Sequence, residues 1–115
     1  MRITVSGCLS YQLTPGDYLR LDSLVGTVEG LVYKSERGFD RAIILWAQSH
    51  NIPVSYVPLD HSHGRARGAI RNTKLMDAVD AVIAFPKGRG SCELIEYAKF
   101  RDKLVIDWTQ TNGRT

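Results

Sequence analysis

Short apolar runs with strand character alternate with helix-like segments along the chain, and this alternation limits the folds open to it. Five runs are apolar and rich in strand-forming residues: 2–7, 31–33, 53–59, 80–85 and 104–108. Four segments between them carry helical patterns: 14–30, 36–51, 69–79 and 90–102. Strands that alternate with helices across short connections predict a parallel sheet covered by helices on both faces. We therefore expect a single Rossmann-like three-layer α/β/α sandwich with a parallel sheet of about five strands.

The apolar positions predict which side of each helix packs on the sheet. The first helix has Pro15 and Asp17 in its first turn and Gly30 as its stop. Its apolar stripe comprises Leu19, Leu21, Leu24, Val25 and Val28. The buried face of the third helix is expected to contain Ala69, Thr73, Met76 and Val79. The aromatic residues expected in the core are Phe39, Trp46, Phe85 and Phe100.

The size and charge of the chain limit its domain organisation and its partners. With 115 residues it has room for one domain, expected at 2–108, followed by a loose tail at 109–115. No apolar run approaches the roughly 20 residues of a membrane helix, and the N-terminus lacks the apolar stretch of a signal peptide. We expect a cytoplasmic protein that does not bind membranes. The net charge of +3 permits anionic partners without requiring nucleic acid.

Glycine and arginine gather where the predicted strands end. In open α/β sheets, ligands bind outside the carboxyl ends of the strands, where the strand order reverses. The loops expected at that edge hold six of the ten glycines: Gly7, Gly38, Gly64, Gly68, Gly88 and Gly90. The opposite edge of the sheet carries nothing comparable, so the distribution predicts a ligand site at the carboxyl edge.

The loop at 86–91, Pro-Lys-Gly-Arg-Gly-Ser, is the leading candidate for a phosphate site. Gly88 and Gly90 allow the backbone to approach a ligand closely, and Arg89 adds positive charge beside them. Ser91 is placed to cap a helix whose free amides attract an anion. The alternative is a plain turn after Pro86 with Ser91 as the cap. The loop matches neither the Walker pattern nor the dinucleotide glycine pattern.

Two further segments could contribute to the same site. Gly38 lies at a strand-to-helix junction, and Asp40 in the next turn could cap the helix or face a ligand hydroxyl. Arg71 and Asn72 follow a loop that also holds Arg65 and Arg67. Arginine suits bidentate phosphate binding and asparagine suits a base edge or a ribose. The alternative for this second segment is a solvated basic start of a helix.

Metal binding and cysteine chemistry are weaker hypotheses. Asp60, His61 and His63 lack a third spaced histidine ligand, so a polar loop is the favoured interpretation and no metal or cofactor is expected. Cys8 and Cys92 cannot form a disulfide framework and suit a reducing compartment. Both fall at the predicted ligand edge, where we interpret them as small packing residues.

Four segments taken in order resemble the SLOG superfamily (Smf/DprA–Lonely Guy), and most closely its small stand-alone YspA-like members. Residues 2–11 resemble that group's opening strand and loop. Residues 35–47 resemble its Gly-Ala-x-Gly-Ala-Asp segment, residues 64–76 its Gly-Pro-x-Arg-Asn segment, and residues 84–94 its Pro-Gly-Gly-x-Gly-Thr loop. The resemblance covers residues 2–108 and implies a Rossmann-like domain that binds a nucleotide or a nucleotide-derived ligand.

The resemblance also implies roles for individual residues. Gly88, Gly90 and Ser91 would line the phosphate, with Pro86, Arg89, Arg71 and Asn72 beside it. Gly38 and Asp40 would flank the sugar or base, and Gly7 with Cys8 would lie under the ligand. Lys34 and Ser35 stand where the family has glycines. Leu94 stands where the hydrolases of the family have a catalytic glutamate, and Glu93 precedes it by one residue.

Three functions follow from these patterns. The first is a nucleotide-binding protein that senses, carries or sequesters its ligand, which needs only the glycine loop and the arginines. The second is an enzyme that cleaves the N-glycosidic bond of a nucleoside monophosphate, with Glu93 or Asp40 as the catalytic residue. The third, ranked last, is a DNA-binding module, because the aromatic residues are expected in the core rather than on a stacking surface. A homo-oligomer, dimer or larger, is expected.

Overall fold

The protein folds into a five-stranded, all-parallel sheet covered by helices, which confirms the predicted α/β class. The computed structural model describes residues 1–59, 61–86 and 93–109. The strands are β1 (Arg2–Ser6), β2 (Gly30–Tyr33), β3 (Val54–Tyr56), β4 (Ala81–Ala84) and β5 (Leu104–Asp107). The helices are α1 (Pro15–Ser23), α2 (Gly38–Ser49), the 3-10 helix η1 (His61–Ala66), α3 (Arg67–Ala78) and α4 (Glu93–Phe100). No helix among the described residues is long and apolar enough to cross a membrane.

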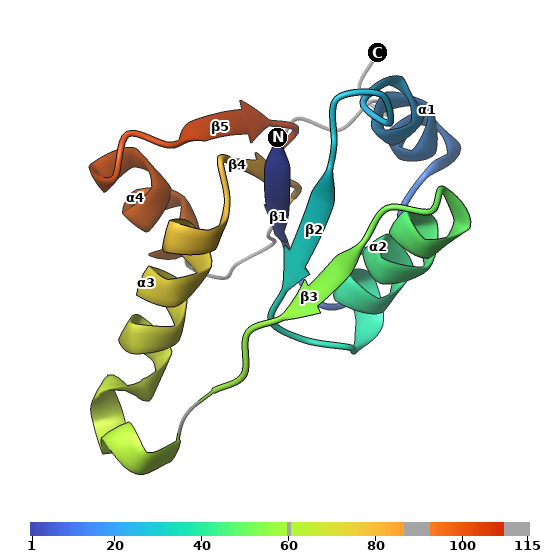
Figure 1. Cartoon of the computed structure of the whole chain (residues 1–115). Helices are drawn as coiled ribbons and strands as arrows, with labels where there is room; N and C mark the ends of the chain where they lie inside the picture. Colours follow the sequence, from blue (N-terminus) through green and yellow to red (C-terminus); the bar gives the residue numbers. More distant parts are fainter. Residues whose placement is uncertain (60, 87–92, 110–115) are drawn as a thin grey trace.

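In the strand order β3-β2-β1-β4-β5, the direction in which successive strands are added to the sheet reverses between β1 and β4. The chain moves outward through β2 and β3, crosses back to β4 and ends at β5 on the other edge. Helices α1 and α2 therefore lie on one face and α3 and α4 on the other, as Figure 1 shows. The carboxyl ends of β1 and β4 are adjacent at this reversal, and the amide of Cys8 donates to the carbonyl of Pro86 at 3.3 Å.

Two clusters of buried side chains hold the layers together, and the alternation along the strands separates them. Ile3 and Val5 of β1 point to the α1–α2 side, where Phe39 and Ile43 of α2 pack against them. Val82 of β4 points to the opposite side. There it packs with residues of β2, α3 and α4: Val32, Leu75, Met76, Val79, Leu94 and Ala98. Burial of each large side chain contributes about 1.5–3 kcal/mol, so both faces of the sheet stabilise the fold.

The predicted first helix is wrong in its second half. Helix α1 ends at Ser23, and the amide of Thr27 bonds to the carbonyl of Leu24 in a following turn. Gly30, expected to stop the helix, begins β2 and pairs with Arg2. Pairing with β1 overrides the helical pattern, because backbone partners across the sheet outweigh a weak local propensity. Leu19, expected in the apolar stripe, is 72% exposed.

The buried face of α3 and one aromatic position also differ from the prediction. Met76 and Val79 are buried as expected, but Ala69 is exposed, and Asn72 and Leu75 are buried in its place. A buried polar residue in this face shifts the apparent periodicity. Phe39, Trp46 and Phe85 are buried as expected, but Phe100 is 85% exposed. Phe100 lies two positions after the buried Ala98, and two helical residues rotate the side chain by about 200° to the outer face.

Candidate functional site

A cavity of about 600 Å³ opens at the carboxyl ends of β1, β2 and β3. Its lining combines backbone from the loop after β1 with charged side chains from the loop after β2, α2 and α3. The residues are Gly7, Leu9, Lys34, Ser35, Glu36, Arg37, Asp40, Tyr56 and Arg71. The volume falls in the range of about 300–1,000 Å³ that is typical of small-molecule sites. The position is where ligands bind in open α/β sheets.

Asp40 is the buried charge of this cavity. Its residue is 3% exposed, and among the described residues only Lys34 pairs with its carboxylate, at 3.7 Å from Nζ to Oδ2. Burial raises the pKa of Asp40 above its ordinary value, although Lys34 and Arg71 act in the opposite direction. Within the described part of the chain Lys34 is its one partner, so acceptor capacity is left for a ligand.

The two roles expected for Asp40 can be distinguished in part. The N-cap of α2 is Arg37, and no side chain forms a capping hydrogen bond there. Asp40 is thus not the cap of its helix, and it lines the cavity instead. Lys34 supplies the cation beside it.

Gly38 positions the start of α2 rather than lining the cavity. Its φ is +53°, and a Cβ at this position would lie 2.3 Å from the carbonyl oxygen of Leu9. The same carbonyl accepts a hydrogen bond from the amide of Phe39 at 3.0 Å. Only glycine allows this close approach of the two backbones. The loop after β1 is therefore held against the first turn of α2, which contains Asp40.

Gly7 lines the cavity and packs closely against the core beneath it. A Cβ at Gly7 would lie 3.0 Å from Cε2 of Phe39 and 3.2 Å from Cβ of Phe85. A side chain at this position would collide with Phe39 and Phe85, so glycine lets the loop after β1 pack directly on the core. Cys8 follows at the same strand end, and its Sγ lies 3.1 Å from Oγ of Ser10. The Ser10 hydroxyl and backbone lower the pKa of the Cys8 thiol.

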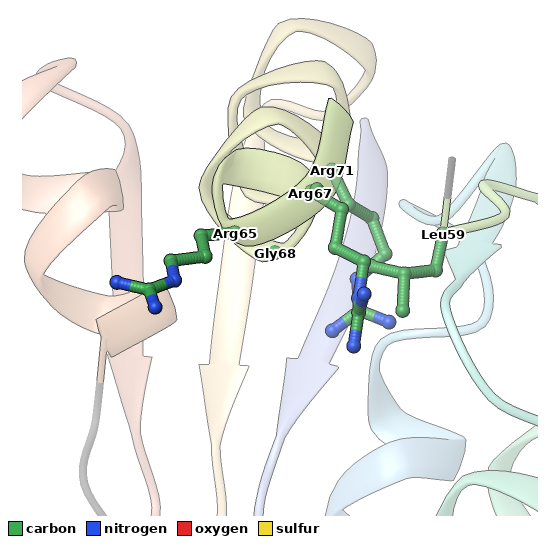
Figure 2. A pocket seen from close by; sticks show the side chains of 6 residues that line it. Leu59, Arg65, Arg67, Gly68 and Arg71 are labelled. Carbon is green, nitrogen blue, oxygen red and sulfur yellow. The ribbon is translucent and has the colours of Figure 1, made fainter. Parts of the chain in front are cut away.

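Arg71 joins this cavity to a second one. The second cavity has a volume of about 490 Å³ and is lined by Leu59, Gly64, Arg65, Arg67, Gly68 and Arg71 (Figure 2). The Nε atom of Arg71 is buried and has no hydrogen-bond partner among the described residues. Asn72, the next residue, is buried on the sheet-facing side of α3. The structure thus brings Arg71 to Asp40 and Gly7, while Asn72 lines neither cavity.

The predicted phosphate loop lies mainly outside the described residues. Strand β4 ends at Ala84, two residues before Pro86, whose carbonyl accepts the bond from Cys8. Gly88, Arg89, Gly90, Ser91 and Cys92 are outside the described part of the chain. Glu93 is the first residue of α4, and its side chain is likewise outside it. The phosphate role of the loop stays a prediction.

Six of the nine lining residues were not assigned to the site from the sequence, and Tyr56 and Lys34 are two of them. Tyr56, the last residue of β3, is 53% exposed and its ring centroid lies 5.3 Å from that of Tyr33. Lys34 directly follows β2, and the sequence pattern did not assign it a role in the site. Both stand at carboxyl ends of strands, and that position was the available signal. Within the described residues, no group of three histidine, cysteine or acidic side chains is arranged to hold a metal ion.

Comparison with models of known families, with curated proteins and with solved structures finds no match to this chain.

Proposed function

We propose that the protein binds a nucleotide or a nucleotide-derived ligand in the cavity at the carboxyl ends of β1, β2 and β3. The observation that carries the proposal is the buried carboxylate of Asp40, which faces the cavity between Lys34 and Arg71. A ligand that suits this arrangement has hydroxyl groups to donate to the carboxylate and an anionic group for the cations. A ribose phosphate has both.

The resemblance to the SLOG superfamily supports the same proposal from the sequence. It implies that the glycine loop at 86–91 anchors a phosphate, and Arg71 would contact that phosphate from α3. Gly7 lines the same cavity from the loop after β1. The exposed ring of Tyr56 at the rim offers a surface on which a base could stack. In this proposal the protein senses, carries or sequesters the ligand, and its oligomeric state and cytoplasmic location remain predictions.

Isothermal titration of the full chain with nucleoside mono-, di- and cyclic phosphates tests the proposal. Arg71→Gln is expected to weaken the affinity about ten- to a hundredfold, as loss of a charged hydrogen bond does. Lys74→Gln removes the same charge from an exposed position of the same helix and is the matched control. Absence of binding by every nucleotide, or equal affinities for the two variants, would overturn the proposal.

An enzymatic alternative has one observation in its favour. A buried carboxyl with a raised pKa that faces a cavity is suited to donate a proton. We propose as this alternative that water cleaves the N-glycosidic bond of a nucleoside monophosphate, releasing the free base and ribose phosphate. Chromatography of the ligand after incubation separates the two functions: intact nucleotide supports binding alone, and free base supports catalysis. Asp40→Asn is then expected to abolish release of the base.

A further inference from the structure

The second cavity presents two arginine side chains to the same space. Arg67 and Arg71 lie four residues apart on α3, a spacing that places them on one face of the helix. Figure 2 shows their guanidinium groups extending in the same direction, beside Leu59. Arg65 also borders the cavity, but its guanidinium extends away from the other two in the same view. The arrangement makes a paired positive site from Arg67 and Arg71.

Neither arginine of this pair forms an ion pair with a described carboxylate, although the charge of Asp40 acts on Arg71 from further away. None of the ion pairs in the described part of the chain includes Arg67 or Arg71. Like charges four residues apart on a helix destabilise it, and the buried Nε of Arg71 lacks a partner there as well. An anion between the two guanidinium groups would remove both costs, because arginine binds phosphate through paired, charge-assisted hydrogen bonds.

Arg71 also defines how the two cavities are related. It borders the cavity that contains Asp40 and the cavity that contains Arg67. An anionic group held by Arg71 is therefore adjacent to both spaces. A ligand with its sugar at Asp40 and its first phosphate at Arg71 has its next phosphate directed toward Arg67.

We infer that the cavity lined by Arg67 and Arg71 is a second anion subsite, and that the ligand is a nucleotide with at least two phosphoryl groups. This inference rests on the proposed function, because it extends the ligand from the Asp40 cavity. The first subsite recognises the sugar and the first phosphate, and the second selects di- and triphosphates over monophosphates. Arg67 is the residue that determines this selection.

Titration of the full chain with adenosine and guanosine mono- and diphosphates tests the inference. The wild type is expected to bind the better diphosphate at least about tenfold more tightly than its monophosphate, as one added arginine–phosphate contact provides. Arg67→Gln is expected to remove this preference and to leave the monophosphate affinity within about twofold. Lys74→Gln is the matched control, since it removes the same charge from an exposed position of the same helix that lines neither cavity. Both residues are exposed, so the variants are expected to fold, which thermal denaturation checks.

The outcomes separate this inference from the proposed function. Equal affinities for mono- and diphosphates in the wild type, or equal effects of Arg67→Gln and Lys74→Gln, overturn the inference and leave nucleotide binding intact. Inorganic tripolyphosphate, which has no sugar or base, probes the subsite alone. If it binds in an Arg67-dependent way while no nucleotide binds, the subsite stands and both the nucleotide ligand and the proposed function fail. If neither binds, both proposals fail.

Discussion

Asp17 and Asp40 are two buried carboxylates, each in the first turn of a helix on the same face of the sheet. Asp17 is 1% exposed and Asp40 is 3% exposed, so burial alone does not distinguish them. They differ in how many hydrogen bonds the protein itself supplies. That difference distinguishes a carboxylate that holds the fold together from one that is available to a ligand.

Asp17 lies in a closed network. Its carboxylate accepts hydrogen bonds from the Tyr11 hydroxyl at 2.5 Å, the Thr14 amide at 2.9 Å and the Arg20 guanidinium at 2.6 Å. Burial raises the pKa of Asp17, but the bonds from Thr14, Tyr11 and Arg20 outweigh it and the pKa is lowered overall. Burial and the neighbouring carboxylate raise the pKa of Tyr11 to about 12. Arg20 also lies over the ring of Trp108, 4.6 Å from its centroid.

Asp40 lies at the edge of a cavity with Lys34 at 3.7 Å, and its pKa is raised. The described residues give Asp17 three hydrogen-bond donors and give Asp40 only the ammonium group of Lys34. A buried charge without full hydrogen bonding lowers the stability of the fold. The position of Asp40 is therefore better explained by a ligand than by stability.

The largest effect is expected from Asp17→Asn. The change breaks the pair with Arg20 and leaves buried donors without their charged acceptor, so the free energy of unfolding is expected to fall by about 3–5 kcal/mol. Asp40→Asn is expected to change it by less than about 1 kcal/mol, because the relief of a buried charge offsets the lost attraction to Lys34. Urea denaturation at pH 7 measures both. Equal losses in the two variants would remove the distinction between the two carboxylates.

Gly38→Ala tests whether the backbone that carries Asp40 is held as tightly as the geometry indicates. The positive φ and the 2.3 Å approach to the Leu9 carbonyl predict a loss of about 2–3 kcal/mol in the free energy of unfolding. Gly26→Ala is the control, because a Cβ there meets nothing within 4 Å. Removing glycine flexibility at a permissive position is neutral or slightly stabilising. A Gly38→Ala variant as stable as Gly26→Ala would contradict the close contact between the loop after β1 and α2.

The class of fold could be predicted from the sequence because the alternation of strands and helices is repeated along the whole chain. The end of α1 could not be predicted. Leu24, Val25 and Val28 continue the helical pattern, and only the pairing of Gly30 with Arg2 places a strand there. Local patterns do not contain that long-range contact.

The edge of the sheet that holds the cavity was predictable from its glycines, and so were Gly7, Asp40 and Arg71. Lys34 and Tyr56 were not singled out for it, because their place in the cavity depends on how three strand ends converge. Gly38 was expected beside the ligand, and in the structure it contacts the Leu9 backbone. A glycine that fits against a backbone and one that fits against a ligand have the same sequence signature.

The pH dependence of stability is expected to separate the two carboxylates by its sign. The pKa of Asp40 is raised, so the folded state favours its neutral form. The free energy of unfolding of the wild type, minus that of Asp40→Asn, is therefore greatest below the ordinary pKa of about 3.8 and falls as pH rises through the folded-state pKa. The pKa of Asp17 is lowered, so the folded state favours its charged form. The free energy of unfolding of the wild type, minus that of Asp17→Asn, is therefore greatest above the ordinary pKa of about 3.8 and falls as pH decreases through the folded-state pKa.

Urea denaturation of the wild type and both variants between about pH 2.5 and pH 7 measures the two slopes. A pKa that differs by one between the folded and unfolded states changes the free energy of unfolding by about 1.4 kcal/mol. The other titrating groups are common to the three proteins and largely cancel in the differences. Slopes of the same sign would show that Asp40 is stabilised by its surroundings as Asp17 is, and the argument for an open acceptor would fail.

The smallest effect concerns the helix starts that hold the two carboxylates. Thr14 caps α1: its side chain accepts from the Asp17 amide at 3.1 Å, and the Asp17 side chain accepts from the Thr14 amide in return. Thr14→Ala is expected to lower the free energy of unfolding by about 1 kcal/mol. Arg37, at the equivalent position of α2, forms no side-chain cap, so Arg37→Ala is expected to stay within about 0.5 kcal/mol of the wild type.

Thermal and urea denaturation of the two variants at pH 7 check this prediction. The control is Thr14→Ser, which keeps the capping hydroxyl and is expected to retain most of the stability of the wild type. A loss in Arg37→Ala as large as that in Thr14→Ala would mean that α2 has a capping interaction of comparable strength. Asp40 would then share the start of its helix with a stabilising network, and its open carboxylate could no longer be attributed to a missing cap.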